Sequence, residues 1–126
     1  RMSEINALLT YAVIQETESI IKNKYKIAKE YIKACNENNW KYIDPISKNQ
    51  RSNFYKFILL SDSKDPKKMF SQIKSRTSPV YDYALGRDPF QIVERHICLP
   101  IWYQLEDKIV KRVVLELTNS SQNLIL

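Results

Sequence analysis

Apolar residues recur at three- and four-residue spacing from the start of the chain, and this period predicts a helix. Ser3 stands where an N-cap is expected, and Glu4 puts negative charge in the first turn, where the helix dipole favours it. A first apolar stripe consists of Ile5, Leu8, Leu9 and Ala12. The stripe lapses across residues 15–19 and resumes with Ile20, Ile21, Ala28, Tyr31, Ile32 and Cys35. We expect two consecutive helices or one bent helix over residues 3–36, with an apolar face that later segments of the chain cover.

Strand formers dominate the part of the chain that follows. Residues 36–39 are poor helix formers and end the helix. Residues 40–43 combine aromatic and β-branched side chains and predict a short strand, which Asp44 and Pro45 close with a turn. Residues 53–61 are nearly all β-formers with little helical period, and they predict the clearest strand. Because the apolar run is almost unbroken, we expect this strand to be central and covered on both faces.

Prolines punctuate the second half of the chain. Asp65 and Pro66 suit the N-cap and the first position of a second helix, which we expect to end near Arg76. The elements expected after it are a strand over 80–84, a short helix from Phe90 through Ile97 that Pro100 ends, an extended segment over 99–103 and an amphipathic helix over 105–117. Residues 119–126 form a tail of uncertain order.

This order of elements predicts a single α+β domain over residues 1–126. The long helical segment 3–36 precedes an α/β layer over 40–118, and the tail 119–126 follows. We expect a small antiparallel or mixed sheet of about three strands with helices packed on one face.

Composition excludes several classes of function. The only glycine, Gly86, leaves no glycine-rich phosphate loop or dinucleotide-binding motif. His96 is the only histidine, which excludes a histidine-rich metal site and argues against a histidine-based catalytic triad. We expect a structural or surface role for His96. Cys35 and Cys98 lie far apart beside apolar residues, which predicts reduced, packed thiols. No apolar run approaches the ~20 residues that cross a bilayer, and we expect a cytoplasmic protein.

The chain is basic, with 20 Lys and Arg against 14 Asp and Glu and a net charge of +6. Many of the lysines lie between residues 22 and 33, interleaved with Glu30, on the polar side of the expected helix. This pattern favours a solvated helical face over a footprint for a polyanion.

Several motifs occur in an order known from one enzyme family. Residues 1–7 (Arg-Met-Ser-Glu-Ile-Asn-Ala) match a loop carrying Asn-x-Arg that runs into Met-Ser-Glu and a long helix. Residues 26–31 match an Ile-Ala-x-x-Tyr helix, and residues 54–59 match an aromatic strand. Residues 65–76 match the helix that follows this strand, and residues 99–101 match a closing Leu-Pro segment. In this order they resemble the C-terminal portion of the DegT/StrS family of pyridoxal-phosphate (PLP)-dependent sugar aminotransferases. The chain departs from the family at 80–86, where Tyr-Pro…Leu-His is usual, and at Tyr103-Gln104, where Pro-Gly is usual.

The resemblance implies the fold of the C-terminal small domain of a fold type I PLP aminotransferase, a nucleotide-sugar substrate and a homodimer. Arg1 corresponds to the arginine that reaches a neighbouring subunit's active site near phosphate groups, where a planar guanidinium makes two charge-assisted bonds. The alternative for Arg1 is a disordered terminus. Tyr55 and Tyr83 fall in segments that resemble pocket-lining strands and are the other candidate substrate-binding residues; the alternative for both is aromatic packing within the sheet.

In the resembled enzymes the Schiff-base lysine, the aspartate paired to the pyridinium nitrogen and the ring-stacking residue all precede the position of Arg1. Because these groups hold the cofactor, we expect no catalytic or PLP-binding residues in this chain and no transamination by this chain alone. Activity would then require a large domain. One alternative is a free-standing, non-catalytic dimerisation module that pairs through the first apolar stripe. Another is a small basic nucleic-acid-binding protein that stacks bases on Tyr and Trp.

Overall fold

The computed structural model describes residues 3–46, 52–62, 71, 73–75 and 91–122 of the 126. The elements in these ranges are α1 (Glu4–Asn38), β1 (Lys41–Ile43), β2 (Phe57–Leu60), α3 (Ile92–Arg95), β3 (His96–Leu99) and α4 (Asp107–Gln122). Among the helices in these ranges, none is long and apolar enough to cross a membrane.

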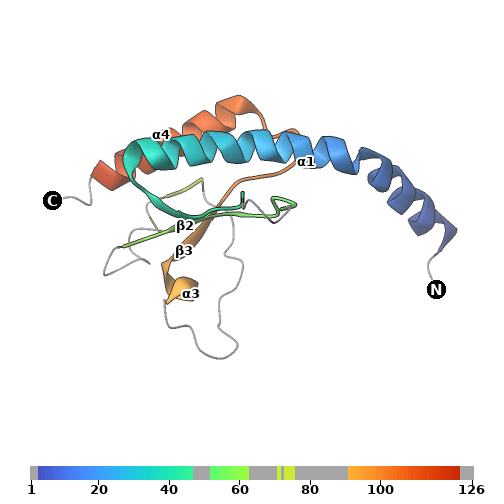
Figure 1. The fold of residues 1–126 in the computed structure, drawn as a ribbon, viewed down its shortest axis with the longest axis horizontal. Coiled ribbons are helices and arrows are strands. Elements are labelled where there is room, and N and C mark those ends of the chain that lie inside the picture. The colour runs from blue at the N-terminus through green and yellow to red at the C-terminus, as the bar shows by residue number, and fades with distance from the viewer. Residues whose placement is uncertain (1–2, 47–51, 63–70, 72, 76–90, 123–126) are drawn as a thin grey trace.

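The helical pattern at the start of the chain forms one continuous helix of 35 residues. The Ser3 side chain accepts a hydrogen bond from the Asn6 N–H, as expected of an N-cap. The helix ends when Asn39 adopts a left-handed conformation (φ 55°), a conformation that asparagine tolerates better than most residues. Figure 1 shows that the first turns of α1, in dark blue, bend away from the rest. Of the two predicted possibilities, two consecutive helices or one bent helix, the structure therefore confirms one bent helix.

The three strands form an antiparallel sheet in the order β1-β2-β3. β2 is central, as predicted, and its register pairs Ile58 with both Ile43 and Cys98. The prediction that both faces of this strand are covered was wrong. Phe57 and Leu59 are buried on one face, but Ile58 and Leu60 on the other face are only half-buried.

The segment 53–56, predicted as strand, is irregular. Phe54 has a positive φ of 51°, which interrupts the extended backbone. The side chains of Ser52 and Asn53 accept hydrogen bonds from the backbone N–H groups of Phe54 and Tyr55, and these local bonds replace the bonds of a strand.

The predicted short helix over 90–97 was wrong at its C-terminal end. α3 stops at Arg95, and His96–Leu99 forms β3, with all four residues buried. Pairing with β2 and burial of both faces outweigh the helical spacing of the apolar residues here. The extended segment expected from residue 99 therefore begins at 96.

Some predicted elements lie wholly or partly outside the described residues. The strand over 80–84 lies outside them, as does most of the helix over 65–76. Ser71 is helical, but residues 73–75 are not, so the predicted end near Arg76 was wrong. In the tail predicted from residue 119, α4 continues to Gln122.

The core lies between the sheet and the two long helices. Figure 1 shows α1 and α4 on the same face of the sheet, and the two helices contact each other. The largest fully buried side chains are Tyr31, Phe57, Ile73, Leu99, Val113, Cys35, Cys98 and Ser61. The Tyr31 hydroxyl donates a 2.8 Å hydrogen bond to the Pro100 carbonyl within this core. The α+β class and the antiparallel three-stranded sheet with helices on one face are therefore confirmed.

Candidate functional site

The candidate substrate-binding residues do not come together in the described part of the protein. Arg1 and Tyr83 lie outside the described residues. Tyr55 precedes β2 rather than belonging to a strand, and 66% of its surface is exposed. Its ring lies 5.4 Å from the Lys56 ammonium and its backbone N–H donates to Asn53. The position of Tyr55 is thus that of a surface aromatic residue, not of a residue packed in the sheet.

A cavity of about 400 Å³ lies between the middle of α1 and the segments that flank β1 and β2. Its lining consists of Glu18, Ile21, Lys22, Tyr25, Pro45, Ile46, Ser52 and Phe54. The Tyr25 and Phe54 rings meet edge to face, with their centroids 5.6 Å apart. The sequence did not reveal this cavity, because its walls come from three separate segments and one of them depends on the positive φ of Phe54.

The residues that line this cavity do not fit PLP. Glu18 and Lys22 lie one turn apart on the same helix, and the Ser52 hydroxyl already accepts a hydrogen bond from the Phe54 N–H. A cofactor phosphate requires several converging N–H or hydroxyl donors. The described lining supplies one ammonium group, on Lys22, and two hydroxyls, on Tyr25 and Ser52, and it also carries the Glu18 carboxylate, which repels a phosphate. We therefore derive no catalytic step through PLP from these residues.

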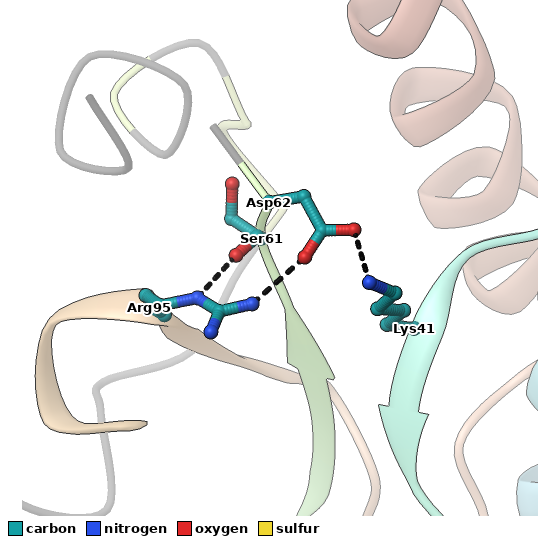
Figure 2. A network of polar contacts seen from close by, with 4 residues as sticks. All are labelled: Lys41, Ser61, Asp62 and Arg95. Carbon is teal, nitrogen blue, oxygen red and sulfur yellow. Dashed lines mark hydrogen bonds and ion pairs between the residues drawn. The ribbon is translucent and has the colours of Figure 1, made fainter. Parts of the chain in front are cut away.

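A polar network joins the ends of the three strands (Figure 2). The Arg95 guanidinium donates from Nε to the Ser61 carbonyl (2.7 Å) and from Nη2 to the Asp62 carboxylate (2.8 Å). The other carboxylate oxygen of Asp62 is 2.8 Å from the Lys41 ammonium. The Ser61 N–H in turn donates to the Arg95 carbonyl. Lys41 lies in β1, Ser61 and Asp62 follow β2, and Arg95 precedes β3, so the network fixes the end of the sheet.

This network was missed at the sequence level because its four residues are separated by up to 54 positions, from Lys41 to Arg95. Its two charge pairs are partly exposed, with 31% of the Arg95 side chain and 56% of the Asp62 side chain accessible. All of its charges are partnered within the network. We therefore assign it to the architecture of the sheet rather than to chemistry.

His96 and the two cysteines are structural. His96 is buried at the start of β3, and its Nδ1 lies 2.8 Å from the Ile92 carbonyl and 3.0 Å from the Val93 carbonyl, which favours the tautomer with a proton on Nδ1. Cys35 and Cys98 are buried thiols rather than a disulfide, as predicted. Burial raises the pKa of the Cys35 thiol to about 12, so the reactive thiolate form is suppressed.

The first half of α1 projects from the core. Every residue from Ser3 to Ser19 is exposed. Ile5, Leu8 and Leu9 remain 72%, 70% and 62% exposed. The prediction that later segments cover this stripe was therefore wrong for the part of the chain that the structure describes. In the described part of the protein, these residues form an exposed apolar surface on one helix.

Comparison with known proteins relates the fold to two solved structures. No family model and no curated protein matches the sequence. The fold is similar to an aminotransferase, TlmJ from Streptoalloteichus hindustanus, with a TM-score of 0.75 and 18% identity over 90% of this chain and 35% of that chain. It is also similar to Spr1654 from Streptococcus pneumoniae, a putative sugar aminotransferase in its apo form, with a TM-score of 0.81 and 14% identity over 99% of this chain and 36% of that chain. This chain thus spans about a third of each of these proteins, and at this identity the likeness shows a shared fold.

Proposed function

We propose that this chain forms the C-terminal small domain of a PLP-dependent nucleotide-sugar aminotransferase. The observation that carries the proposal is that nearly the whole chain, 99% of it, superposes on about a third of a putative sugar aminotransferase. The order of motifs that resembles the DegT/StrS family supports the same assignment from the sequence. In this role the domain packs beside the sugar nucleotide and contributes to a homodimer, while PLP supplies the electron sink from a site on a large domain.

The projecting half of α1 supports this proposal. At 100° per residue, the stripe of Ile5, Leu8, Leu9 and Ala12 is rotated by roughly 90° from the face that buries Ile27, Tyr31 and Cys35 in the core. The stripe is therefore not a continuation of the core of this domain. A large domain that packs against it would remove it from water, and burial of a leucine or isoleucine side chain contributes about 1.5–3 kcal/mol.

The test of the proposal is reconstitution with the sequence encoded immediately upstream in the genome of origin, whether in frame with this chain or separate from it, produced as a polypeptide. We expect that polypeptide to contain the PLP-binding lysine, to bind this chain and to transfer an amino group to a nucleotide-linked keto sugar only in its presence. Replacing Ile5 and Leu9 by glutamate should weaken binding at least tenfold, because both charges would enter the apolar contact. The control is L115E, a change at a 60% exposed position on α4, which should bind as the unmodified chain does. An upstream polypeptide unrelated to aminotransferases would overturn the proposal.

The second candidate function is a free-standing, non-catalytic interaction module. The exposure of Ile5, Leu8 and Leu9 favours it equally, since such a surface also serves self-association. The two candidates differ in what covers the stripe. In the module the I5E/L9E variant loses self-association, and in the aminotransferase domain it loses the contact with the large domain.

A further inference from the structure

The cavity beside the middle of α1 has the size and the walls of a small-molecule site. Its volume of about 400 Å³ lies within the range of about 300–1,000 Å³ that is usual for ligand pockets. The apolar part of its wall consists of Ile21, Tyr25, Pro45, Ile46 and Phe54. Phe54 is buried, whereas Tyr25 is 38% exposed and keeps ring surface that a ligand can cover. An apolar or aromatic group of a ligand therefore fits against this wall.

Two opposite charges border the apolar wall and are not paired with each other. Glu18 and Lys22 line the cavity from successive turns of α1. Among the residues that the structure describes, neither of them has an ion-pair partner. Lys33 and Glu37, at the same four-residue spacing on the same helix, lie 3.9 Å apart. Both charges at the cavity are therefore available to a ligand.

The polar groups of the described lining match a ligand that carries one charge of each sign. The charges of Glu18 and Lys22 cancel, so a ligand without net charge leaves neither of them unbalanced. Residues four positions apart on a helix are separated by about 6 Å along its axis, which allows both to contact neighbouring groups of one small molecule. The Ser52 oxygen accepts a hydrogen bond from the Phe54 N–H, and the hydroxyl proton can be donated to an anionic group.

We propose that this cavity binds a free aromatic α-amino acid. The α-ammonium group contacts the Glu18 carboxylate, and the α-carboxylate contacts the Lys22 ammonium and the Ser52 hydroxyl. The side-chain ring packs against Ile21 and Tyr25, and it extends the edge-to-face contact that the Tyr25 and Phe54 rings already make. The contact is reversible binding without a chemical step. It is distinct from amino-group transfer, because this lining does not fit PLP.

Other classes of ligand match the lining less well. A phosphate or a nucleotide would bring several negative charges beside the Glu18 carboxylate. An aromatic amine or an aromatic acid would leave one of the two charges without a partner and partly desolvated. An aromatic residue at either end of a peptide keeps only one of its two charged groups. The lining therefore favours the free amino acid over a peptide that carries the same ring.

This inference does not depend on the proposed function. By helical geometry, the α1 residues that line the cavity are turned roughly 140° from the stripe of Ile5, Leu8, Leu9 and Ala12. A large domain on the stripe and an amino acid in the cavity therefore occupy different sides of α1. Loss of amino acid binding leaves the aminotransferase assignment intact, and failure to reconstitute activity leaves the binding intact.

The first measurement is a titration of the isotopically labelled chain with L-phenylalanine, followed by the amide resonances in NMR spectra. We expect saturable shifts at the cavity residues and a dissociation constant of about 1–2 mM or tighter, as about a dozen ligand heavy atoms can support. Three analogues each lack one feature: L-alanine the ring, 3-phenylpropionate the ammonium group and 2-phenylethylamine the carboxylate. Each should bind about fivefold more weakly or worse. Equal binding of all four compounds, shifts away from the cavity or the absence of saturable binding would overturn the proposal.

The second measurement assigns each charge of the ligand to its partner. E18Q should weaken the binding of L-phenylalanine about tenfold and leave that of 3-phenylpropionate unchanged, because that compound has no ammonium group. K22Q should weaken L-phenylalanine to a similar extent and leave 2-phenylethylamine unchanged. The matched control is K33Q/E37Q, which removes the same two charge types at the same spacing outside the cavity and should bind as the unmodified chain does.

The amide spectra of the free variants confirm that each is folded. Undiminished binding of L-phenylalanine by folded E18Q and K22Q would contradict the assigned contacts. An equal loss of binding in K33Q/E37Q would show that the effect is general to the charge of α1, and it would contradict them as well.

Discussion

Tyr31 illustrates how single residues join the elements of this fold. Its ring is buried on α1 and packs against Phe57 of β2, with centroids 5.2 Å apart, and its hydroxyl reaches the carbonyl of Pro100 after β3. One side chain thus connects a helix, the central strand and the end of an edge strand. Burial raises the pKa of this phenol, so its proton remains in place to donate the hydrogen bond at neutral pH.

Replacing Tyr31 by phenylalanine should lower the free energy of unfolding by about 1–2 kcal/mol. The reason is that the Pro100 carbonyl loses its donor inside the core and stays unsatisfied. Urea unfolding followed by circular dichroism measures the change. The matched control is Y11F on the exposed part of α1, whose unfolding free energy should stay within about 0.5 kcal/mol of the unmodified chain. An equal effect of both substitutions would contradict the role assigned to Tyr31.

The buried Cys35 thiol makes stability depend on alkaline pH. In the unfolded chain this thiol ionises near pH 9.0, whereas in the folded chain its pKa is about 12. Unfolding therefore releases a proton in this window, and stability should fall from pH 9 toward pH 12 by up to about 1.4 kcal/mol per pH unit. The C35A variant should show a shallower decline, measured by thermal unfolding across this pH range. The same decline in both proteins would show that Cys35 contributes nothing to it.

Glu116 makes the stability of the fold depend on acidic rather than alkaline pH. Partial burial would raise the pKa of its carboxyl, but hydrogen bonds from Ser75 and from the Lys74 N–H, together with the nearby Arg112, lower it instead. The lowered pKa means that this contribution to stability is present at neutral pH and is lost as the pH falls through the folded pKa. Glu116 thereby fixes residues 74 and 75 against α4.

At the scale of elements, α4 is the clearest amphipathic helix of the fold. Val110, Val113 and Leu117 are buried against α1 and the sheet, whereas Leu115 is 60% exposed. Leu117→Ala should lower the free energy of unfolding by about 2–4 kcal/mol, because it removes buried methyl groups and leaves a cavity. Leu115→Ala should change it by less than about 0.5 kcal/mol. Chemical denaturation of the two variants checks the difference, and equal losses would mean that the helix is rotated from the orientation described here.

The elements differ in how far the sequence predicted them, and the differences have physical causes. α1, β1, β2 and α4 follow from local periodicity and β-propensity, and the structure confirms them with shifts of a few residues. His96–Leu99 was misplaced because its apolar spacing suits a helix, and only pairing with β2 reveals it as a strand. The irregular segment before β2 depends on the positive φ of Phe54, and a phenylalanine in the sequence does not predict this conformation.

The sequence predicted the candidate site residues and their contacts less well than it predicted the fold. Tyr55 was assigned to a strand by propensity. Instead, the Phe54 and Tyr55 N–H groups donate to the side chains of Ser52 and Asn53, and Tyr55 lies on the surface. The network of Lys41, Asp62 and Arg95 joins charges that have no spacing relation in the chain. Such arrangements arise from tertiary packing, so no local pattern encodes them.

At the scale of the whole molecule, the protein consists of a packed α+β body and a helix that extends beyond it. In the described residues, the core of the body lies between the sheet and the helices α1 and α4, and Figure 1 shows the N-terminal turns of α1 leaving it. The fold is that of about a third of two aminotransferase structures. These observations support the proposal of a small domain that packs beside a large domain.

The visible absorption spectrum in the presence of PLP tests this central claim most directly. The chain alone should give only the spectrum of free PLP, and the complex with the upstream-encoded polypeptide should develop the band of a lysine-bound cofactor, which borohydride reduction fixes on a peptide of that polypeptide. If reduction instead fixes PLP stoichiometrically on one lysine of this chain alone, the account of a non-catalytic small domain is contradicted.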